Sequence, residues 1–252
     1  MLNKPLAPAA AVVALLSAAV APARAEPVRN VVIVHGAFAD GSGWRRVADI
    51  LGKDGYTVTV VQEPLTSLAD DVAATKRVLD LQQGPTLLVG HSYGGVVITE
   101  AGNAPNVAGL VYIAAFIPDQ GQSAVGLLSQ APVANNDMRA TKDDFLYLDP
   151  AAFAADFAAD IPPAEARFMA RSQAMAAKAA AGAPVTTAAW HQKKSWALVA
   201  TRDRNINPDL QRSMAKHAGS EMIELPASHA VYLSKPKDVA RLIDRAAKAS
   251  SR

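Results

Sequence analysis

The chain has 252 residues, enough for one large α/β domain or two small ones, and half of its residues are hydrophobic. Its 25 basic and 23 acidic residues are mixed along the sequence, which argues against nucleic acid or an anionic membrane surface as the main partner. The sequence contains no cysteine, which excludes a cysteine nucleophile and thiolate metal ligands.

The first 25 residues have the layout of a secretory signal peptide. Lys4 precedes an apolar stretch from Ala9 to Val20, and Ala23-Arg24-Ala25 forms an A-x-A cleavage pattern. The apolar stretch is shorter than the roughly 20 residues that a membrane span requires. We therefore expect cleavage after Ala25, a periplasmic or secreted protein, and no stable membrane span in the mature chain. An uncleaved anchor or a disordered tail is the alternative.

From Val28 onward the sequence alternates strand and helix patterns. Strands are expected at 28–34, 56–61, 86–89, 107–114, 195–201 and 221–225, and helices at 43–53, 67–82, 93–103, 208–217 and 235–248. Ser42 could cap the first of these helices, and Ser67 or Thr66 the second. Short buried strands separated by helices predict βαβ units and a mostly parallel sheet with helices on both faces. This α/β core is expected over residues 26–118 and 191–252.

The alternating pattern stops between residues 119 and 190. No clear strand is expected there, alanine makes up nearly half of residues 151–189, and prolines interrupt the segment repeatedly. Apolar side chains such as Phe153, Phe157 and Phe168 recur and could anchor the segment on the core. We therefore expect an inserted helical lid over residues 119–190, with a low-complexity linker as the alternative.

A G-x-S-x-G motif lies at the junction of a predicted strand and helix, as Gly90-His91-Ser92-Tyr93-Gly94. In such a turn the serine is raised on a strained backbone, and Gly90 and Gly94 leave room where strand and helix pass closely. The hydroxyl then lies at a helix N-terminus, which favours negative charge. A phosphate loop is disfavoured because the P-loop lysine and a G-x-G-x-x-G spacing are missing. Ser92 is therefore the predicted nucleophile.

A serine nucleophile requires a base, and the sequence offers five histidines. His229 follows the last predicted strand, at the carboxyl edge of the sheet where sites of open α/β folds gather. His35 and His91 flank glycine motifs and are interpreted as structural, and His191 and His217 as surface residues. His229 is the predicted base.

The acid that orients this histidine is expected to be Asp203, which follows the strand at 195–201. This choice gives the chain order nucleophile, acid, base. Asp119, after the strand at 107–114, has a compatible place in that order and is the alternative.

Backbone donors for a developing oxyanion are expected at two places. One is the N–H group of Tyr93, directly after the nucleophile. The other lies in the loop after the first strand, where Gly36 lets the backbone turn close to the site. We assign this second donor to Ala37, with Phe38 as the alternative.

With these residues placed, the chain resembles the α/β-hydrolases over essentially its whole mature length. Within that superfamily it is similar to small serine esterases related to the salicylic-acid-binding plant methylesterases, and to the hydroxynitrile lyases. The matching stretches are VHGAFADGSGW, LTSLADDVAAT, LVGHSYGGVVITEAG, LVYIAAFIPDQG, SWALVATRDRNI and ASHAVYLSKP.

The resemblance implies a serine esterase that needs no metal and no organic cofactor. The hydroxynitrile lyases carry threonine where this chain has Gly36, and lysine where it has Ala230, so ester hydrolysis is favoured over cyanide elimination. The expected substrate is a small to medium, apolar or aromatic ester, and the sequence does not indicate an oligomeric state. The alternatives are a lyase or cofactor-free perhydrolase or oxygenase on the same scaffold, or a non-catalytic ligand-binding relative.

Overall fold

The computed structural model describes residue 1 and residues 26–131, 133 and 137–251. The predicted signal peptide therefore lies, apart from Met1, outside the described residues. Within the described ranges, no helix combines the length and the apolar character needed to cross a membrane.

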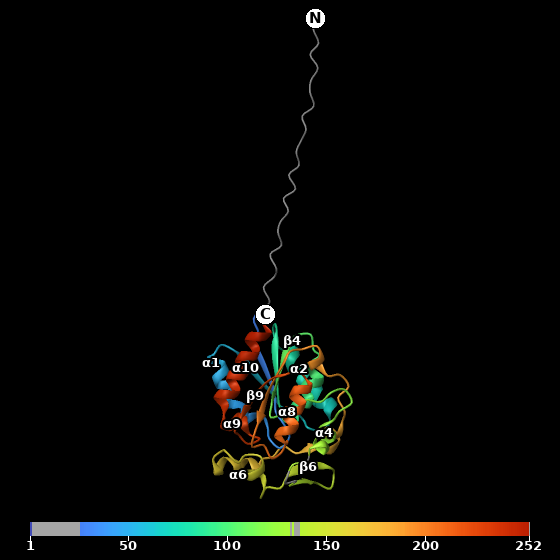
Figure 1. Ribbon diagram of the computed structural model, residues 1–252, viewed down its shortest axis with the longest axis vertical. Helices are drawn as coiled ribbons and strands as arrows, with labels where there is room; N and C mark the ends of the chain where they lie inside the picture. The colour runs from blue at the N-terminus through green and yellow to red at the C-terminus, as the bar shows by residue number, and fades with distance from the viewer. Residues whose placement is uncertain (2–25, 132, 134–136, 252) are drawn as a thin grey trace.

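A sheet of six parallel strands forms the centre of the molecule, in the order β2-β1-β3-β4-β8-β9 (Figure 1). The strands are β1 (Asn30–Val34), β2 (Thr57–Val61), β3 (Thr86–His91), β4 (Val107–Ile113), β8 (Ser195–Ala200) and β9 (Glu221–Leu225). Every residue of β1, β3 and β8 is buried, whereas the edge strands β2 and β9 are partly exposed. The strand order reverses between β1 and β3, which is where open α/β sheets place their ligand sites.

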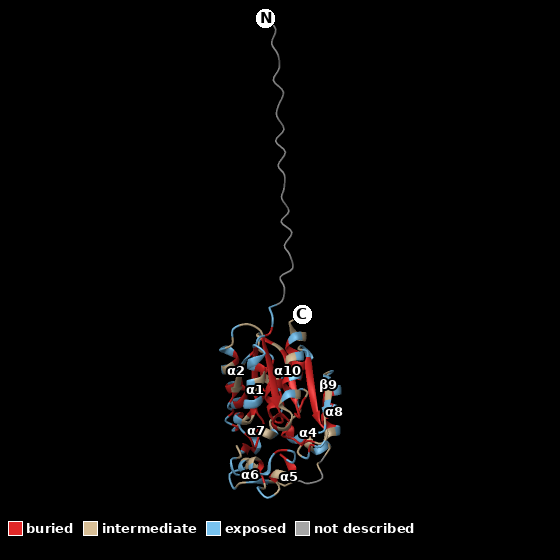
Figure 2. Cartoon of the chain, turned by 90° about the vertical axis from the view of Figure 1, so that its left-hand side faces the viewer, coloured by how far each residue is buried: buried red, intermediate tan, exposed pale blue. Residues whose placement is uncertain are grey.

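Helices cover both faces of this sheet, and the colouring in Figure 2 shows buried strands beneath helices with exposed outer sides. The helices of the core are α1 (Arg45–Lys53), α2 (Leu68–Asp80), α3 (Gly94–Ala101), α8 (Pro208–His217), α9 (Val231–Ser234) and α10 (Pro236–Ser250). Ser67 caps α2 as predicted, because its hydroxyl accepts from the amide of Asp70 at 3.1 Å. The predicted bounds of α8 and β9 are confirmed.

Two short helical elements that precede predicted helices were not expected from the sequence. The helix predicted at 43–53 is preceded by a 3-10 turn, η1 (Gly41–Trp44), which is capped by Asp40 rather than by Ser42. The carboxylate of Asp40 accepts from the Ser42 amide at 2.8 Å, so Ser42 is a partner of the cap and not the cap. The last predicted helix is α10, and the short helix α9 precedes it because Pro236 interrupts the helical hydrogen bonds.

The chain leaves the core between β4 and β8, and the described part of residues 114–194 is here called the insertion. The insertion contains the helices α4 (Ala124–Gln130), α5 (Phe153–Asp156), α6 (Pro163–Arg171), α7 (Lys178–Gly182) and the 3-10 turn η2 (Ala189–His191). It also contains an antiparallel sheet of β5 (Met138–Ala140), β6 (Phe145–Leu148) and β7 (Ala176–Ala177). The expectation that this region has no strand is therefore wrong, although helices are present in it as predicted. Its elements α5, α6 and β6 lie over one end of the sheet (Figures 1 and 2).

The strands of the insertion escaped prediction because they are short and the turn between them is unusual. β7 consists of two alanines, which carry no strand signal. The turn between β5 and β6 is closed by the Thr141 hydroxyl, which accepts from the Phe145 amide at 2.9 Å, and Asp144 has a φ of 63°. Of the predicted anchors, Phe153 and Phe157 are fully buried, but Phe168 is 64% exposed.

Candidate active site

The serine of the G-x-S-x-G motif lies in a sharp turn between β3 and α3. Ser92 has a φ of 51°, a left-handed conformation that costs a non-glycine residue about 1–3 kcal/mol. A Cβ atom at Gly90 would lie 2.6 Å from the carbonyl oxygen of Gly94, and a Cβ at Gly94 would lie 2.5 Å from that of Val34. Both glycines are thus required by backbone contacts, and the turn raises the Ser92 hydroxyl at the start of α3.

We expect Gly94→Ala to destabilise the protein by about 3 kcal/mol or more, because the added methyl group would overlap backbone that cannot rotate away. The measurement is urea unfolding followed by circular dichroism. Gly182→Ala is the matched control, since nothing lies within 4 Å of a Cβ added there. Equal unfolding midpoints for the two variants would contradict the steric role of Gly94.

The structure brings Ser92, His229 and Asp203 together in one hydrogen-bonded row. Nε2 of His229 lies 2.9 Å from Oγ of Ser92, and Nδ1 lies 2.7 Å from Oδ2 of Asp203. All three residues are buried. The carboxylate of Asp203 also accepts from the amides of Asn205 at 2.8 Å and Ile206 at 3.0 Å. These donors fix the carboxylate so that one oxygen faces the imidazole.

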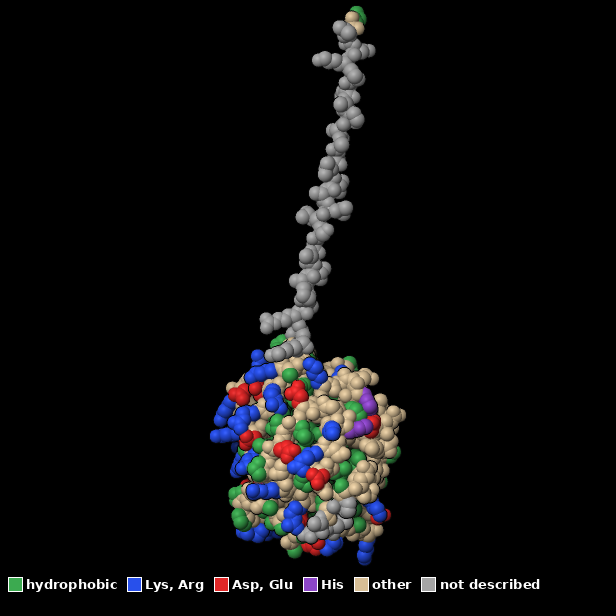
Figure 3. All heavy atoms as spheres, viewed as in Figure 1, with side chains coloured by type: hydrophobic (Ala, Val, Ile, Leu, Met, Phe, Trp, Pro, Cys, Tyr) green, Lys and Arg blue, Asp and Glu red, His purple; other side chains and the backbone are tan. Residues whose placement is uncertain are grey.

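Asp119, the alternative acid, contacts two other histidines instead of His229. Its two oxygens lie 2.8 Å from Nε2 of His191 and 3.0 Å from Nε2 of His217. Burial alone would raise the pKa of Asp119, but the hydrogen bonds from His217 and His191 lower it to about 2. Histidine side chains adjoining an acidic one are visible on the surface in Figure 3. His191 and His217 were predicted to be surface residues, and their side chains are 56% and 61% exposed. Each is nevertheless bound to Asp119.

The two histidines beside glycine motifs hold backbone groups near the site. His91 is fully buried, and its Nε2 donates to the carbonyl oxygen of His229 at 3.0 Å. Burial and the nearby His229 hold the pKa of His91 well below its usual range, so it is neutral. Nδ1 of His35 lies 2.9 Å from the carbonyl oxygen of Gly36. Its Nε2 accepts from the backbone amide of Glu63 at 3.1 Å. Burial lowers the pKa of His35 as well.

The predicted oxyanion donors lie beside Ser92, and the structure separates the two alternatives for the second donor. The amide of Phe38 donates to the carbonyl oxygen of Ala174 at 2.9 Å and is therefore already used. Within the part of the chain that the structure describes, the amides of Ala37 and Tyr93 donate to no other protein group. A Cβ atom at Gly36 would lie 2.7 Å from Cβ of Ser92, so a larger residue at this position would require Ser92 to shift.

Two polar residues that support the site were missed from the sequence. The Tyr93 hydroxyl donates to Asp71 of α2 at 2.9 Å, and burial raises the pKa of this carboxyl group. The side-chain amide of Gln211, from α8, donates to Oδ2 of Asp203 at 2.8 Å. Both Asp71 and Gln211 are almost fully buried. The sequence clue to them was a polar residue on the buried face of an amphipathic helix.

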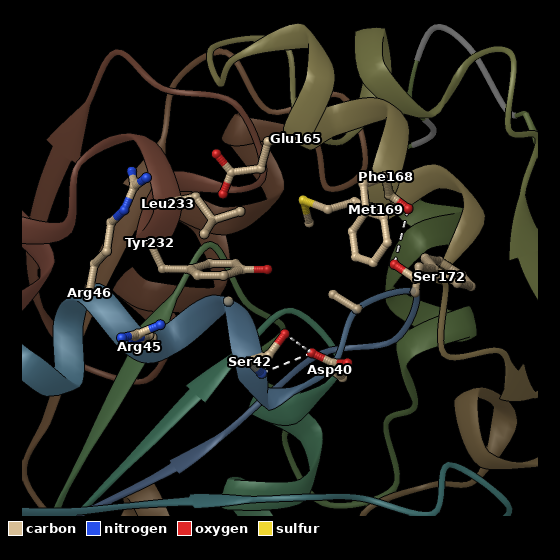
Figure 4. A pocket seen from close by; sticks show the side chains of 13 residues that line it. Asp40, Ser42, Arg45, Arg46, Glu165, Phe168, Met169, Ser172, Tyr232 and Leu233 are labelled. Atoms are coloured by element: carbon tan, nitrogen blue, oxygen red, sulfur yellow. Dashed lines mark hydrogen bonds between the residues drawn. The ribbon is translucent and has the colours of Figure 1, made fainter.

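One cavity contains Ser92 in its lining, and a second cavity shares Phe38 with it. The smaller, of about 60 Å³, is lined by Ser92, by both predicted oxyanion donors and by apolar residues that include Phe116 and Leu128. The larger, of about 550 Å³, lies between α6 on one side and η1 and α1 on the other (Figure 4). Among the described residues, no cluster of three or more histidine, aspartate and glutamate side chains is placed to hold a metal ion.

Residues 31–242 match the family model described as the alpha/beta hydrolase family, and the chain belongs to that family. A carbendazim hydrolyzing esterase from Nocardioides sp. (strain SG-4G) is 35% identical over 116 residues, which cover 40% of this chain and 48% of the relative. The match thus spans about half the length of that curated relative.

Solved structures show the same fold over nearly the whole described chain. A pyrethroid hydrolase from Sphingobium faniae JZ-2 has a TM-score of 0.75 at 22% identity, covering 88% of this chain and 98% of that chain. An extracellular alpha/beta-hydrolase from a Paenibacillus species has a TM-score of 0.71 at 20% identity, covering 87% and 99%. Its structure is described as sharing structural and functional homology with tobacco salicylic acid binding protein 2. The predicted fold is confirmed, and the neighbours include the predicted branch.

Proposed function

We propose that this protein is a carboxylesterase that acts through an acyl-enzyme intermediate on Ser92. The observation that carries the proposal is the position of His229, whose two ring nitrogens contact Ser92 at 2.9 Å and Asp203 at 2.7 Å. His229 accepts the proton of the Ser92 hydroxyl as its oxygen attacks the ester carbonyl. Asp203 holds the imidazole in the required tautomer and stabilises the imidazolium.

The tetrahedral intermediate carries its negative charge on the former carbonyl oxygen. The amides of Ala37 and Tyr93 are the proposed donors to this oxygen, and each such donor is worth about 3–4 kcal/mol. His229 then gives its proton to the leaving alcohol, and the acyl group stays on Ser92. In deacylation His229 takes a proton from water, the hydroxide attacks the acyl carbon, and the proton returns to Ser92 as the acid leaves.

The relatives support hydrolysis rather than a particular substrate. An esterase and a pyrethroid hydrolase are among the matches, and their printed names both describe hydrolytic enzymes. The lyase alternative is disfavoured because this chain has Gly36 and Ala230 where the hydroxynitrile lyases carry threonine and lysine. Export from the cytoplasm is proposed from the signal-peptide pattern, and a mature N-terminus at Glu26 would be its test.

The cavities favour an ester with a short acyl group. The cavity of about 60 Å³ beside Ser92 has room for roughly four or five water-sized groups. Its apolar lining suits a hydrocarbon acyl chain of that size. We place the alcohol part on the His229 side, where the leaving oxygen must receive its proton and where the larger cavity lies against Tyr232 and Leu233.

We expect kcat/KM for p-nitrophenyl esters to be highest for acetate to butyrate. For octanoate it should be lower by about tenfold or more. The reason is that longer chains exceed the cavity, so their added methylenes cannot be buried. Leu128→Ala enlarges this cavity and should move the optimum toward longer chains, whereas Leu81→Ala, at an exposed residue away from both cavities, should not. A steady rise of kcat/KM up to octanoate in the unaltered enzyme would contradict the size limit.

A further inference from the structure

The loop that carries His229 is fastened to the insertion on both sides of the histidine. The amide of Ser228 donates to Oδ2 of Asp160 at 3.1 Å, and its hydroxyl donates to the other oxygen of the same carboxylate. The amide of Ala230 donates to the carbonyl oxygen of Phe157 at 2.9 Å. The residues before and after His229 are thus bound by groups only three positions apart in the insertion.

The same stretch of the insertion reaches the loop that carries Asp203. The carbonyl oxygen of Asp156 accepts from the side-chain amide of Asn205 at 2.8 Å, and its carboxylate pairs with Nε of Arg204 at 3.0 Å. The backbone amide of Asn205 in turn donates to Asp203 at 2.8 Å. Residues 153–160, which we call the clamp segment, therefore contact the loops of both the base and the acid.

The clamp segment also contacts the imidazole ring itself. The ring of Phe157 meets that of His229 edge to face, with centroids 4.8 Å apart and an interplanar angle of 79°. Phe157 is fully buried and stacks on Phe153 at 4.9 Å. An aromatic ring held in this way limits tilting of the imidazole away from Ser92.

The His229 loop needs such support because it has no regular structure of its own. It runs from the end of β9 at Leu225 to the start of α9 at Val231, outside the hydrogen-bond ladder of the sheet. Ser228 is buried within it, whereas Asp160 is exposed. Although partial burial opposes it, the hydrogen bonds from Ser228 lower the pKa of Asp160, so its carboxylate is charged at neutral pH.

We propose that the clamp segment positions the catalytic base, and that Asp160 is a positioning residue that acts through Ser228 on His229. The proposal rests on the proposed esterase function, because it concerns the geometry of the same three side chains. The clamp segment must remain docked while Ser92 is activated, so this part of the insertion belongs to the catalytic apparatus although it lies outside the α/β core. A displacement of about 1 Å in such a group can cost up to about 100-fold in rate.

The test compares Asp160→Ala, Asp160→Asn and Ser228→Ala with the unaltered enzyme on p-nitrophenyl acetate. The kcat is expressed per active site, counted by titration with a fluorophosphonate, so that a misfolded fraction does not lower it. We expect kcat to fall about tenfold in Asp160→Ala and about fivefold in Ser228→Ala, with KM changed less than about twofold. Asp160→Asn keeps an acceptor oxygen for Ser228 and should recover most of the loss.

Asp143→Ala is the matched control, since Asp143 lies in the insertion, outside the clamp segment, and accepts from the Thr141 hydroxyl at 2.6 Å. Its kcat should equal that of the unaltered enzyme. Ser228→Ala removes one oxygen atom and keeps the proposal testable if Asp160→Ala does not fold. Activity of the unaltered enzyme tests the esterase proposal separately. If the unaltered enzyme is active, the positioning role of the clamp segment is refuted when Asp160→Ala and Ser228→Ala both keep kcat within about twofold of its value. It is also refuted when these variants change only KM.

Discussion

Ser92→Ala is expected to lower kcat for p-nitrophenyl acetate by at least about 10⁴-fold while the protein stays folded. The side chain of Ser92 supplies the attacking oxygen, and alanine keeps the Cβ atom and the backbone turn but has no nucleophile. The residual rate would come from the backbone donors and from substrate binding, which remain. The measurement is steady-state kinetics together with the unfolding temperature of each variant.

A control for Ser92→Ala is Ser129→Ala, which removes an exposed serine hydroxyl of α4 that donates to the carbonyl oxygen of Gly126 at 2.7 Å. This variant should hydrolyse the ester at the unaltered rate. A Ser92→Ala enzyme with more than about a tenth of the original kcat would exclude Ser92 as the nucleophile and reopen the lyase and ligand-binding alternatives.

Asp203→Asn is expected to lower kcat by about 10⁴-fold, because an amide cannot hold His229 in the tautomer that accepts a proton from Ser92. Asp119→Asn is expected to change kcat less than about threefold. Asp119 binds the partly exposed side chains of His191 and His217 and does not touch His229. Its loss should cost at most about 1 kcal/mol of stability, as is usual for ion pairs near the surface.

The two variants are matched, since each replaces one carboxylate by its amide at nearly the same volume. Their kinetics are best compared at one pH near neutrality, with urea unfolding as the check on folding. Equal losses of kcat, or a larger loss in Asp119→Asn, would overturn the assignment of the acid.

The residues of the site could be predicted because their signals are local. Ser92 lies in a short motif whose glycines are needed for steric reasons that hold in any chain, as the contact of 2.5 Å at Gly94 illustrates. Asp203 and His229 each follow a strand, and parallel strands end at one edge of the sheet. Topology therefore brings together three residues that lie up to 137 positions apart.

The partners of these residues could not be predicted in the same way. Gln211 and Asp71 contact the site from helices, and nothing in the neighbouring sequence states what lies opposite them. The choice between Ala37 and Phe38 depended on a hydrogen bond from Phe38 to Ala174, which is 136 positions away. Contacts of this kind depend on how the insertion packs on the core.

The insertion was the part of the fold that sequence patterns described least well. Its strands span two to four residues, too few for a period of two to be detected. The alanine-rich composition favoured helices, yet alanine is also compatible with the pair Ala176–Ala177 that forms β7. Tertiary pairing with β6 decided the outcome there, and local propensity did not.

The most direct test of the central assignment is the reaction of the protein with a fluorophosphonate, followed by mass spectrometry of the intact chain and its peptides. We expect one phosphonyl group per molecule, located on the peptide that contains Ser92, with loss of ester hydrolysis in proportion to labelling. His229→Ala should react far more slowly, because the hydroxyl then lacks its base. Full esterase activity without an adduct on Ser92, or an adduct on another residue that abolishes activity, would contradict the proposed mechanism.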